Sequence, residues 1–290
     1  MQKDSVALAW SVSRSSPTML GKRLITAAVL IIILLLAVFW FNRAAFAIFL
    51  SLVTIIGAWE WALLAGFNKS IARAWYCLFF SGISLVAYFS LQEYWRAILL
   101  VSFASWILAL FMICAYPKLS GIWTRTMPLS FIGILVLFPC WFALLLLRDH
   151  EQFTAGFLSL IALVAAADSG AYFSGRKLGK HKLAVLVSPN KTWEGVVGGL
   201  LACVALTGVL FILSNRVYEQ PPNGLFFLIL PFVISSFSVT GDLFESMVKR
   251  MRGVKDSGSL LPGHGGILDR IDGIVAAAPV FVLMLFFFTR

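Results

Sequence analysis

The chain has 290 residues, of which 60% are hydrophobic and only 12% are charged, with a mean hydropathy of +0.93 and a formal net charge of +10. About a quarter of the residues in soluble globular domains are charged, so this composition excludes an ordinary soluble protein and requires that apolar side chains face lipid. The four cysteines lie in apolar runs without a CxxC pair, and the three histidines are scattered, which argues against disulfides and a zinc site.

Nine apolar stretches are long enough to cross the hydrocarbon core of a bilayer, which takes about 17–25 helical residues. They cover residues 24–41, 44–66, 73–91, 95–116, 128–147, 153–173, 193–214, 225–248 and 272–289. The sequence therefore predicts an all-α integral membrane protein with about nine transmembrane helices. Only Asn42 and Arg43 separate the first two stretches.

The basic residues alternate in number from one predicted loop to the next. If the N-terminus is cytoplasmic, 18 of the 23 Lys and Arg residues fall in inside segments and five in outside segments. Such an excess of basic residues on one side is what the positive-inside rule predicts for cytoplasmic loops. We therefore expect a multi-pass protein with a cytoplasmic N-terminus, and we expect no nucleic-acid partner for the positive charge.

Acidic residues in or beside the spans are distributed unevenly, and such residues are functional candidates by default. Up to residue 150 only Glu60 lies within a span; it could be hydrogen-bonded within the bundle or reach a lipid cavity. Later acids gather at predicted cytoplasmic helix ends: Asp168, Glu194, Asp242, Glu245, Asp269 and Asp272. The sequence thus predicts a transmembrane scaffold at 1–150 and a catalytic region at 151–290, with cytoplasmic loops 174–192 and 249–271.

The first polar cluster closes the sixth span and continues into a basic loop. A positive-inside loop explains its Lys and Arg residues but not Asp168, which stands beside a glycine and near Tyr172 at the membrane boundary. Ser188 or Thr192 could cap the seventh helix, whose N-terminus would favour an anion. We expect substrate contacts here from Asp168, Tyr172, Ser188, Lys191 and Thr192.

The second cluster falls on one face of the eighth helix. Asp242, Glu245, Ser246 and Lys249 stand at positions i, i+3, i+4 and i+7. Two carboxylates, a hydroxyl and an ammonium group near the membrane surface indicate binding of a hard cation and of phosphate. The alternative is a polar stripe that packs helices and pairs internally.

The third cluster combines glycines with carboxylates at the start of the last span. Four glycines between positions 258 and 266 allow backbone amides to approach an anion closely. Asp269 and Asp272 follow, and carboxylates there can bind Mg²⁺ together with substrate phosphates. The role of His264 in this loop stays open. The chain has no GxxxxGK[ST], GxGxxG or GxSxG motif, and the GxxxG at Gly195–Gly199 indicates a close helix contact.

One long pattern joins the second and third clusters. It reads Ser246-x-Val248-Lys249-Arg250-x₄-Lys255-Asp256-x-Gly258-x₂-Leu261-Pro262-x-His264-Gly265-Gly266-x₂-Asp269-Arg270-x-Asp272. It closely resembles the signature of the phosphatidate cytidylyltransferase family, the CDP-diacylglycerol synthases. The segments Asp168-x-Gly170-Ala171-Tyr172 and Ser188-Pro189-x-Lys191-Thr192-Trp193-Glu194-Gly195 resemble that family's other shared blocks, so the similarity covers residues 168–272.

The resemblance implies a reaction in which CTP and phosphatidic acid give CDP-diacylglycerol and pyrophosphate. It also implies a divalent cation, Mg²⁺ or Mn²⁺, and a multi-helix protein of the cell inner membrane whose active site faces the cytoplasm. Family members are often dimeric, so a second copy of the chain joins CTP, phosphatidic acid and membrane lipid as a candidate partner. The aspartates that match Asp242 and Asp269 are similar to the family's metal ligands, and Asp272 is a further candidate.

The residues suit this chemistry, because a lipid phosphate is already an anionic nucleophile and needs no strong base. Metal ions and basic side chains would stabilise the charge that develops as the phosphate attacks the α-phosphorus of CTP. We expect catalytic roles for Asp242, Asp269, Lys249, Lys255 and Arg270. Further substrate contacts are expected from Ser246, Arg250, Asp256, His264, Gly265 and Gly266.

Two other functions remain open at this stage. One is a related cytidylyltransferase that acts on another lipid phosphate. The other is an ion-coupled transporter, but transporters place their polar residues near the bilayer midplane, on broken helices of two repeated halves. Here the acids gather at one predicted face and no internal repeat is visible. The enzyme is therefore favoured.

Overall fold

The computed structural model describes residues 17–118, 120–218, 222–261 and 265–288, and the side chains within these ranges from residue 25 onward. Its elements are the helices α1 (Pro17–Trp40), α2 (Arg43–Ala65), α3 (Ser70–Ser90), α4 (Trp95–Ala115), α5 (Ser120–Trp123), α6 (Thr126–Arg148), α7 (Phe153–Leu178), α8 (Trp193–Val217), α9 (Gly224–Met251) and α10 (Leu268–Phe288), the 3₁₀ turn η2 (Gln92–Tyr94), and the strands β1 (Lys182–Ala184) and β2 (Ser188–Thr192). The predicted all-α membrane fold is confirmed.

Eight helices, from α2 to α4 and from α6 to α10, are long and apolar enough to cross a membrane. They correspond to eight of the nine predicted spans. The remaining one, 24–41, corresponds to α1, whose described apolar part, Ile25–Trp40, is shorter than the other eight. A ninth crossing and a cytoplasmic N-terminus therefore stay predictions.

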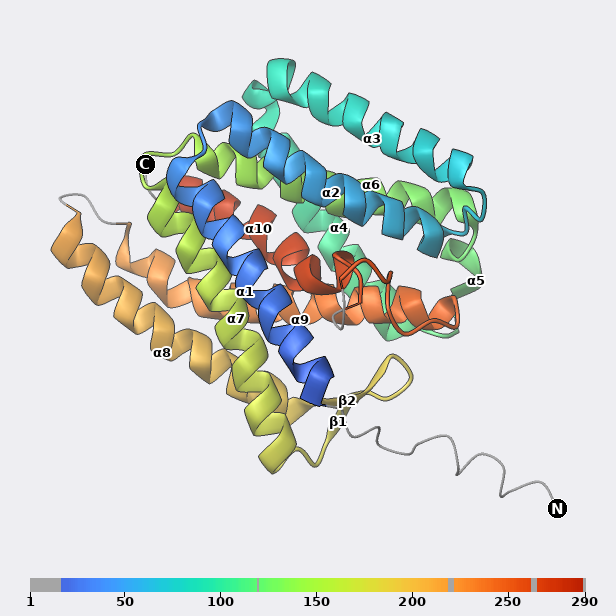
Figure 1. Ribbon diagram of the computed structural model, residues 1–290. Coiled ribbons are helices and arrows are strands. Elements are labelled where there is room, and N and C mark those ends of the chain that lie inside the picture. Colours follow the sequence, from blue (N-terminus) through green and yellow to red (C-terminus); the bar gives the residue numbers. More distant parts are fainter. Residues whose placement is uncertain (1–16, 119, 219–221, 262–264, 289–290) are drawn as a thin grey trace.

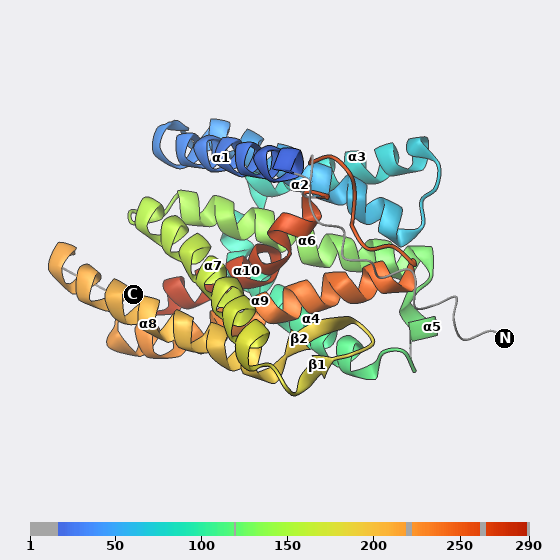
Figure 2. The same ribbon diagram turned by 60° about the horizontal axis from the view of Figure 1, so that its bottom comes forward.

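The spans form two groups around a central pair of helices (Figures 1 and 2). Helices α2, α3 and α6 pack together on one side, and α7 packs along α8 on the other. Between them α10 contacts α9, α6, α4, α7 and α2. Buried residues make up 67% of the α6 span and 61% of the α10 span, but only 17% of the α8 span. The core is thus centred on α6 and α10, and α8 leaves most of its apolar surface open to lipid.

Polar residues mark several helix ends. The side chain of Asn42 accepts a hydrogen bond from the N–H of Ala45 at the start of α2, and Gly66 ends that helix with a φ of 106°. An L-residue rarely adopts this left-handed conformation, which glycine supplies without strain. Asn223 caps α9 in the same way as Asn42 caps α2.

The loops near the polar clusters are shorter than the predicted ranges 174–192 and 249–271. Helix α7 continues to Leu178, α9 continues to Met251, and α10 begins at Leu268. Hydropathy locates only the end of an apolar run. These helices continue beyond that end for about one more turn, which is built from polar residues. The first loop also contains an antiparallel hairpin of β1 and β2 that the sequence analysis missed.

Glycines bring α7 and α8 into close contact, as the GxxxG spacing predicted. A Cβ at Gly170 would lie 2.6 Å from the carbonyl oxygen of Gly198, and a Cβ at Gly199 would lie 2.6 Å from that of Ala167. Only glycine permits such an approach of two helix backbones. The contact holds Asp168 on α7 close to the N-terminal half of α8.

Candidate active site

The predicted polar clusters meet in one cleft of about 650 Å³ at the ends of α7 to α10, beside the hairpin. This volume is in the range of small-molecule sites, about 300–1,000 Å³. Eight of the predicted site residues line the cleft: Asp168, Tyr172, Lys191, Thr192, Asp242, Asp269, Arg270 and Asp272. The cleft is thus lined by residues of α7, β1, β2, α8, α9 and α10.

Asp242 is bound from two sides. Its Oδ2 lies 2.6 Å from Nζ of Lys191, at the end of β2, and its Oδ1 accepts a hydrogen bond of 3.2 Å from Oγ of Ser246. The second contact confirms that Asp242 and Ser246 share a face of α9. Ser246 therefore acts on the cleft through Asp242, and Lys191 balances the charge of this carboxylate.

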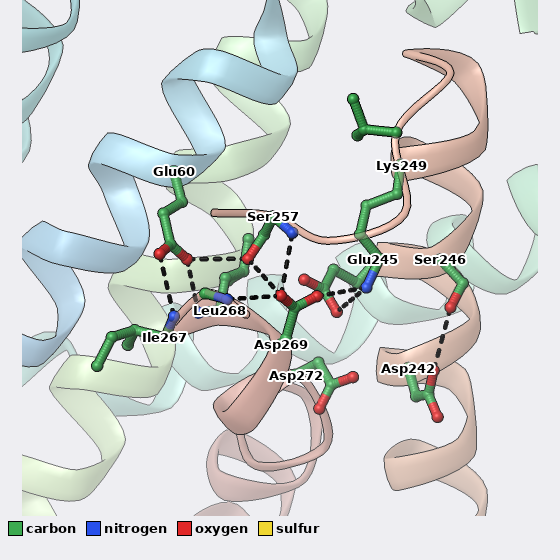
Figure 3. Close-up of polar contacts among 12 residues, drawn as sticks. Glu60, Asp242, Glu245, Ser246, Lys249, Ser257, Ile267, Leu268, Asp269 and Asp272 are labelled. Atoms are coloured by element: carbon green, nitrogen blue, oxygen red, sulfur yellow. Dashed lines mark hydrogen bonds and ion pairs between the residues drawn. The ribbon is translucent and has the colours of Figure 1, made fainter. Parts of the chain in front are cut away.

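Asp269 is fixed more tightly, at the start of α10 (Figure 3). Its Oδ1 lies 2.6 Å from Nζ of Lys249. Its Oδ2 accepts hydrogen bonds from the backbone N–H groups of Ser257 and Gly266, at 3.0 and 2.9 Å, and from Oγ of Ser257 at 3.0 Å. Lys249 is only 8% exposed and also contacts Glu245 at 3.1 Å, so it supports Asp269 from within the protein.

A third group of carboxylates surrounds the same space. Asp168, Asp242 and Asp272 lie close enough for their charges to interact. Asp168 accepts a hydrogen bond of 3.3 Å from Ser238, and Asp272 accepts one of 2.8 Å from the N–H of Gly273. Such a concentration of negative charge favours a cation within the cleft.

Within the described ranges, no three His, Cys, Asp or Glu side chains form a ready-made metal site. Mg²⁺ is commonly held by one or two carboxylates together with waters and substrate phosphates, so the donor set fits a cation that arrives with its substrate. Asp242 and Asp272 open onto the cleft in this way. Both oxygens of Asp242 and both oxygens of Asp269 already have donors, so a cation bound by either carboxylate would have to replace one of these donors.

Two basic residues of the cleft lining were not assigned from the sequence. Arg176, at the end of α7, and Lys182, in β1, line it together with Lys191 and Arg270. Arg176 donates a hydrogen bond of 3.0 Å to the hydroxyl of Tyr172. In the sequence they counted only as positive-inside charges, because neither the extension of α7 to Leu178, which carries Arg176, nor the hairpin, which carries Lys182, was predicted.

Among the other predicted residues, Thr192 caps α8 by accepting a hydrogen bond of 3.1 Å from the N–H of Gly195. Arg250 binds backbone carbonyls of Val187, in the hairpin turn, and Val254. The remainder stand away from the cleft lining: Ser188 lies in β2, Lys255 and Asp256 are exposed on the loop, and Gly265 adjoins Asp269. His264 lies outside the described residues.

The chain is similar to known proteins over most of its length. The model of the cytidylyltransferase family matches residues 21–288. A protein of Pseudomonas aeruginosa named phosphatidate cytidylyltransferase is 42% identical over 268 residues, which cover 92% of this chain and 97% of that protein. A protein of the same name from Haemophilus influenzae is 40% identical over 286 residues, 93% of this chain and 99% of its own. The resemblance inferred from the motifs is confirmed: the chain belongs to the cytidylyltransferase family.

Proposed function

We propose that the chain transfers the cytidylyl group of CTP to phosphatidic acid and releases pyrophosphate. The observation that carries this proposal is the cleft in which carboxylates and basic side chains of five elements, α7, β1, β2, α9 and α10, converge. Its lining suits a nucleoside triphosphate and a metal ion together. The two relatives compared above, named phosphatidate cytidylyltransferases, support the choice of acceptor.

The reaction needs few groups from the protein. An oxygen of the lipid phosphate forms a bond to the α-phosphorus of CTP, and the bond from that phosphorus to the oxygen bridging to the β-phosphorus breaks. Pyrophosphate leaves with the electron pair. Arg176, Lys182, Lys191 and Arg270 would bind the phosphates and oppose the mutual repulsion of the two anionic substrates, which is the main barrier to in-line attack.

A divalent cation, Mg²⁺ or Mn²⁺, would add charge neutralisation at the transferring phosphoryl group. Asp242 and Asp272 would hold it, with Asp269 as the third predicted ligand. Lys191 would then exchange its contact with Asp242 for one with a substrate phosphate. Because Ser246 and Lys249 fix the orientation of Asp242 and Asp269, the ligands are positioned before substrate arrives.

We also propose that the cleft opens at the cytoplasmic face of the cell inner membrane. It lies where α7 ends, beside the basic hairpin loop, at the end of the bundle predicted to be inside. CTP would enter from the aqueous phase, and the lipid would reach the same cleft from the membrane.

The assay is transfer of labelled CTP by the purified protein to phosphatidic acid in mixed micelles. Radioactivity should enter the lipid phase only when protein, phosphatidic acid and Mg²⁺ are all present. A panel of other lipid phosphates tests the alternative acceptor class: a polyprenyl phosphate used in preference to phosphatidic acid would replace the proposed acceptor. No transfer to any acceptor by folded protein would contradict the proposed function.

A further inference from the structure

Glu60 lies on α2, in the half of the chain predicted to be scaffold, and the reaction described above does not use it. Its side chain is only 5% exposed. Burying a carboxylate within a transmembrane helix costs free energy unless its oxygens are hydrogen-bonded. A carboxylate at such a position therefore indicates a role that an apolar residue could not fill. The contacts of Glu60 all lead to the loop between α9 and α10 (Figure 3).

Both carboxylate oxygens of Glu60 accept hydrogen bonds from the far end of this loop. Oε1 accepts one of 3.0 Å from the N–H of Ile267, and Oε2 accepts one of 2.8 Å from the N–H of Leu268. These groups stand at the start of α10, where backbone N–H groups have no partner within the helix and a negative charge is favoured. Glu60 thus caps α10 from a different helix, and it does so as an acceptor only.

The loop is shaped to admit this carboxylate. A Cβ at Gly258 would lie 2.5 Å from Oε1 of Glu60, and a Cβ at Gly266 would overlap both Oε2 of Glu60 and Oγ of Ser257. A side chain at either position would displace the carboxylate of Glu60 or shift the loop. These two glycines therefore allow Glu60 to come close to the loop. From the sequence, we had expected the glycines of this loop to bind an anionic group of the substrate through their backbone amides. The amide of Gly266 is already donated to Asp269.

Ser257 connects Glu60 to the cleft. Its Oγ lies 2.9 Å from Oε2 of Glu60 and 3.0 Å from Oδ2 of Asp269, and its single hydroxyl proton can be donated to either carboxylate. The N–H groups of Ser257 and Gly266 bind the same Oδ2. A shift of the loop would therefore move three of the donors that orient Asp269.

The start of the loop is tied to α2 as well. Arg252 donates from Nε to the carbonyl oxygen of Leu64 at 2.5 Å and from a terminal nitrogen to that of Ala65 at 2.6 Å. These carbonyls end α2 and lack partners within the helix. The loop 252–267 is thus attached to α2 at both ends, and Glu60 makes the attachment nearer to Asp269.

We propose that Glu60 is a positioning residue for cytidylyl transfer: it holds Ser257 and residues 266–267 of the loop between α9 and α10 against α2 and thereby sets the orientation of Asp269 in the cleft. This inference rests on the proposed function, because the loss that it predicts is a loss of transfer. It gives the first half of the chain a direct part in the site.

The test is Glu60→Gln, which keeps the size of the side chain but replaces one acceptor by an amide donor. That NH₂ group must face the N–H of Ile267 or of Leu268. We expect kcat to fall roughly 10- to 100-fold, as for a displacement of about 1 Å in a catalytic group. The KM for CTP should change by less than about threefold, since the basic residues of the cleft are untouched. Glu60→Asp, which keeps both acceptors on a shorter side chain, should recover part of kcat.

The matched control is Ser51→Ala, on the same helix. It removes the hydrogen bond of 3.0 Å that Ser51 accepts from Nε1 of Trp141, a tertiary contact with no part in the loop. Its kcat should equal that of wild type. Hydrogen–deuterium exchange gives a readout besides activity: Glu60→Gln should speed exchange at residues 257–268, and Ser51→Ala should not.

The outcomes separate the two proposals. If Glu60→Gln keeps the kcat of wild type, the positioning role is overturned while the proposed function stands. The same holds if hydrogen–deuterium exchange becomes faster in every helix and each folded molecule keeps a normal kcat. If the wild-type protein is inactive, the proposed function is contradicted. The role of Glu60 in holding the loop is then tested by exchange alone, and unchanged exchange at residues 257–268 in Glu60→Gln would contradict it. If Glu60→Gln does not fold, Gly258→Ala replaces it, because the new Cβ would lie 2.5 Å from Oε1 of Glu60 and would displace this carboxylate from the loop. An unchanged kcat in that variant would overturn the proposal.

Discussion

Lys249 illustrates how a single side chain organises the acidic residues around it. It is buried between Glu245 and Asp269, at 3.1 and 2.6 Å, and it does not line the cleft. Loss of one partner of a buried ion pair leaves an uncompensated charge and typically costs about 3–5 kcal/mol. The sequence allowed that the polar side chains on this face of α9 pair with one another inside the protein. Lys249 does so, whereas Asp242 on the same face lines the cleft.

Asp242 is the residue at which the metal assignment is best tested. Asp242→Asn keeps the shape of the side chain but removes the charge that would hold the cation and that pairs with Lys191. Transfer should fall roughly 10²- to 10³-fold, as when an electrostatic contact to the transition state is lost, and more Mg²⁺ should be needed for half-maximal rate. The measurement is a Mg²⁺ titration of the transfer rate.

Asp149→Asn is the control for this substitution. Asp149 also forms an ion pair, with Nε of Arg43 at 2.8 Å, but it lies at the other end of α6 and α7, away from the cleft. Its Mg²⁺ titration should match that of wild type. Near-normal turnover of Asp242→Asn at ordinary Mg²⁺ concentrations would contradict the role given to Asp242.

At the level of whole elements, the close contact between α7 and α8 determines the width of the cleft. Asp168 and Tyr172 lie on α7, while Lys191 and Thr192 immediately precede α8. Any separation of the two helices would move these pairs apart. The glycines at the contact are therefore as important for the site as the polar residues that they bring together.

Gly170→Ala tests this dependence. The new Cβ would lie 2.6 Å from the carbonyl oxygen of Gly198 and 2.8 Å from Cβ of Ala202. Overpacking of this kind costs about 1–3 kcal/mol, so the variant should unfold at a lower temperature and transfer more slowly. Gly208→Ala, on α8, has open space around the new Cβ and should be neutral or slightly stabilising. Equal stability of the two variants would show that the helices do not depend on this contact.

The sequence predicted the helices whose length and apolar composition are determined by contact with lipid. Apolar runs of bilayer length located α2 to α4 and α6 to α10, because a helix in hydrocarbon must satisfy its own backbone. Helix ends in water lack that constraint, so the extension of α7 to Leu178 and the hairpin at 182–192 were missed. The hairpin is short, polar and held by tertiary contacts such as that of Glu194 with His181, at 2.6 Å, which local sequence does not reveal.

For the molecule as a whole, the residues that line the cleft and the residues that support it come from different parts of the chain. The described residues that line the cleft all come from position 168 onward. Yet Glu60 and the end of α2 hold the loop whose N–H groups bind Asp269. In the sequence, the only sign of this role was that Glu60 is an isolated acidic residue within an apolar span. Its partners lie about 200 residues away along the chain, so only the fold identifies them.

If the chain is a CTP:phosphatidate cytidylyltransferase, the α-phosphorus of CTP moves to the lipid while the β- and γ-phosphates stay in water, and the position of a label on CTP distinguishes these fates. Parallel reactions of the purified protein would contain phosphatidic acid, Mg²⁺ and CTP labelled with ³²P at either the α- or the γ-phosphate. The α-label should enter the lipid phase in step with the cytosine ring, and the γ-label should stay in water as pyrophosphate. Lipid that carries the γ-label, or no lipid label from either CTP, would contradict cytidylyl transfer.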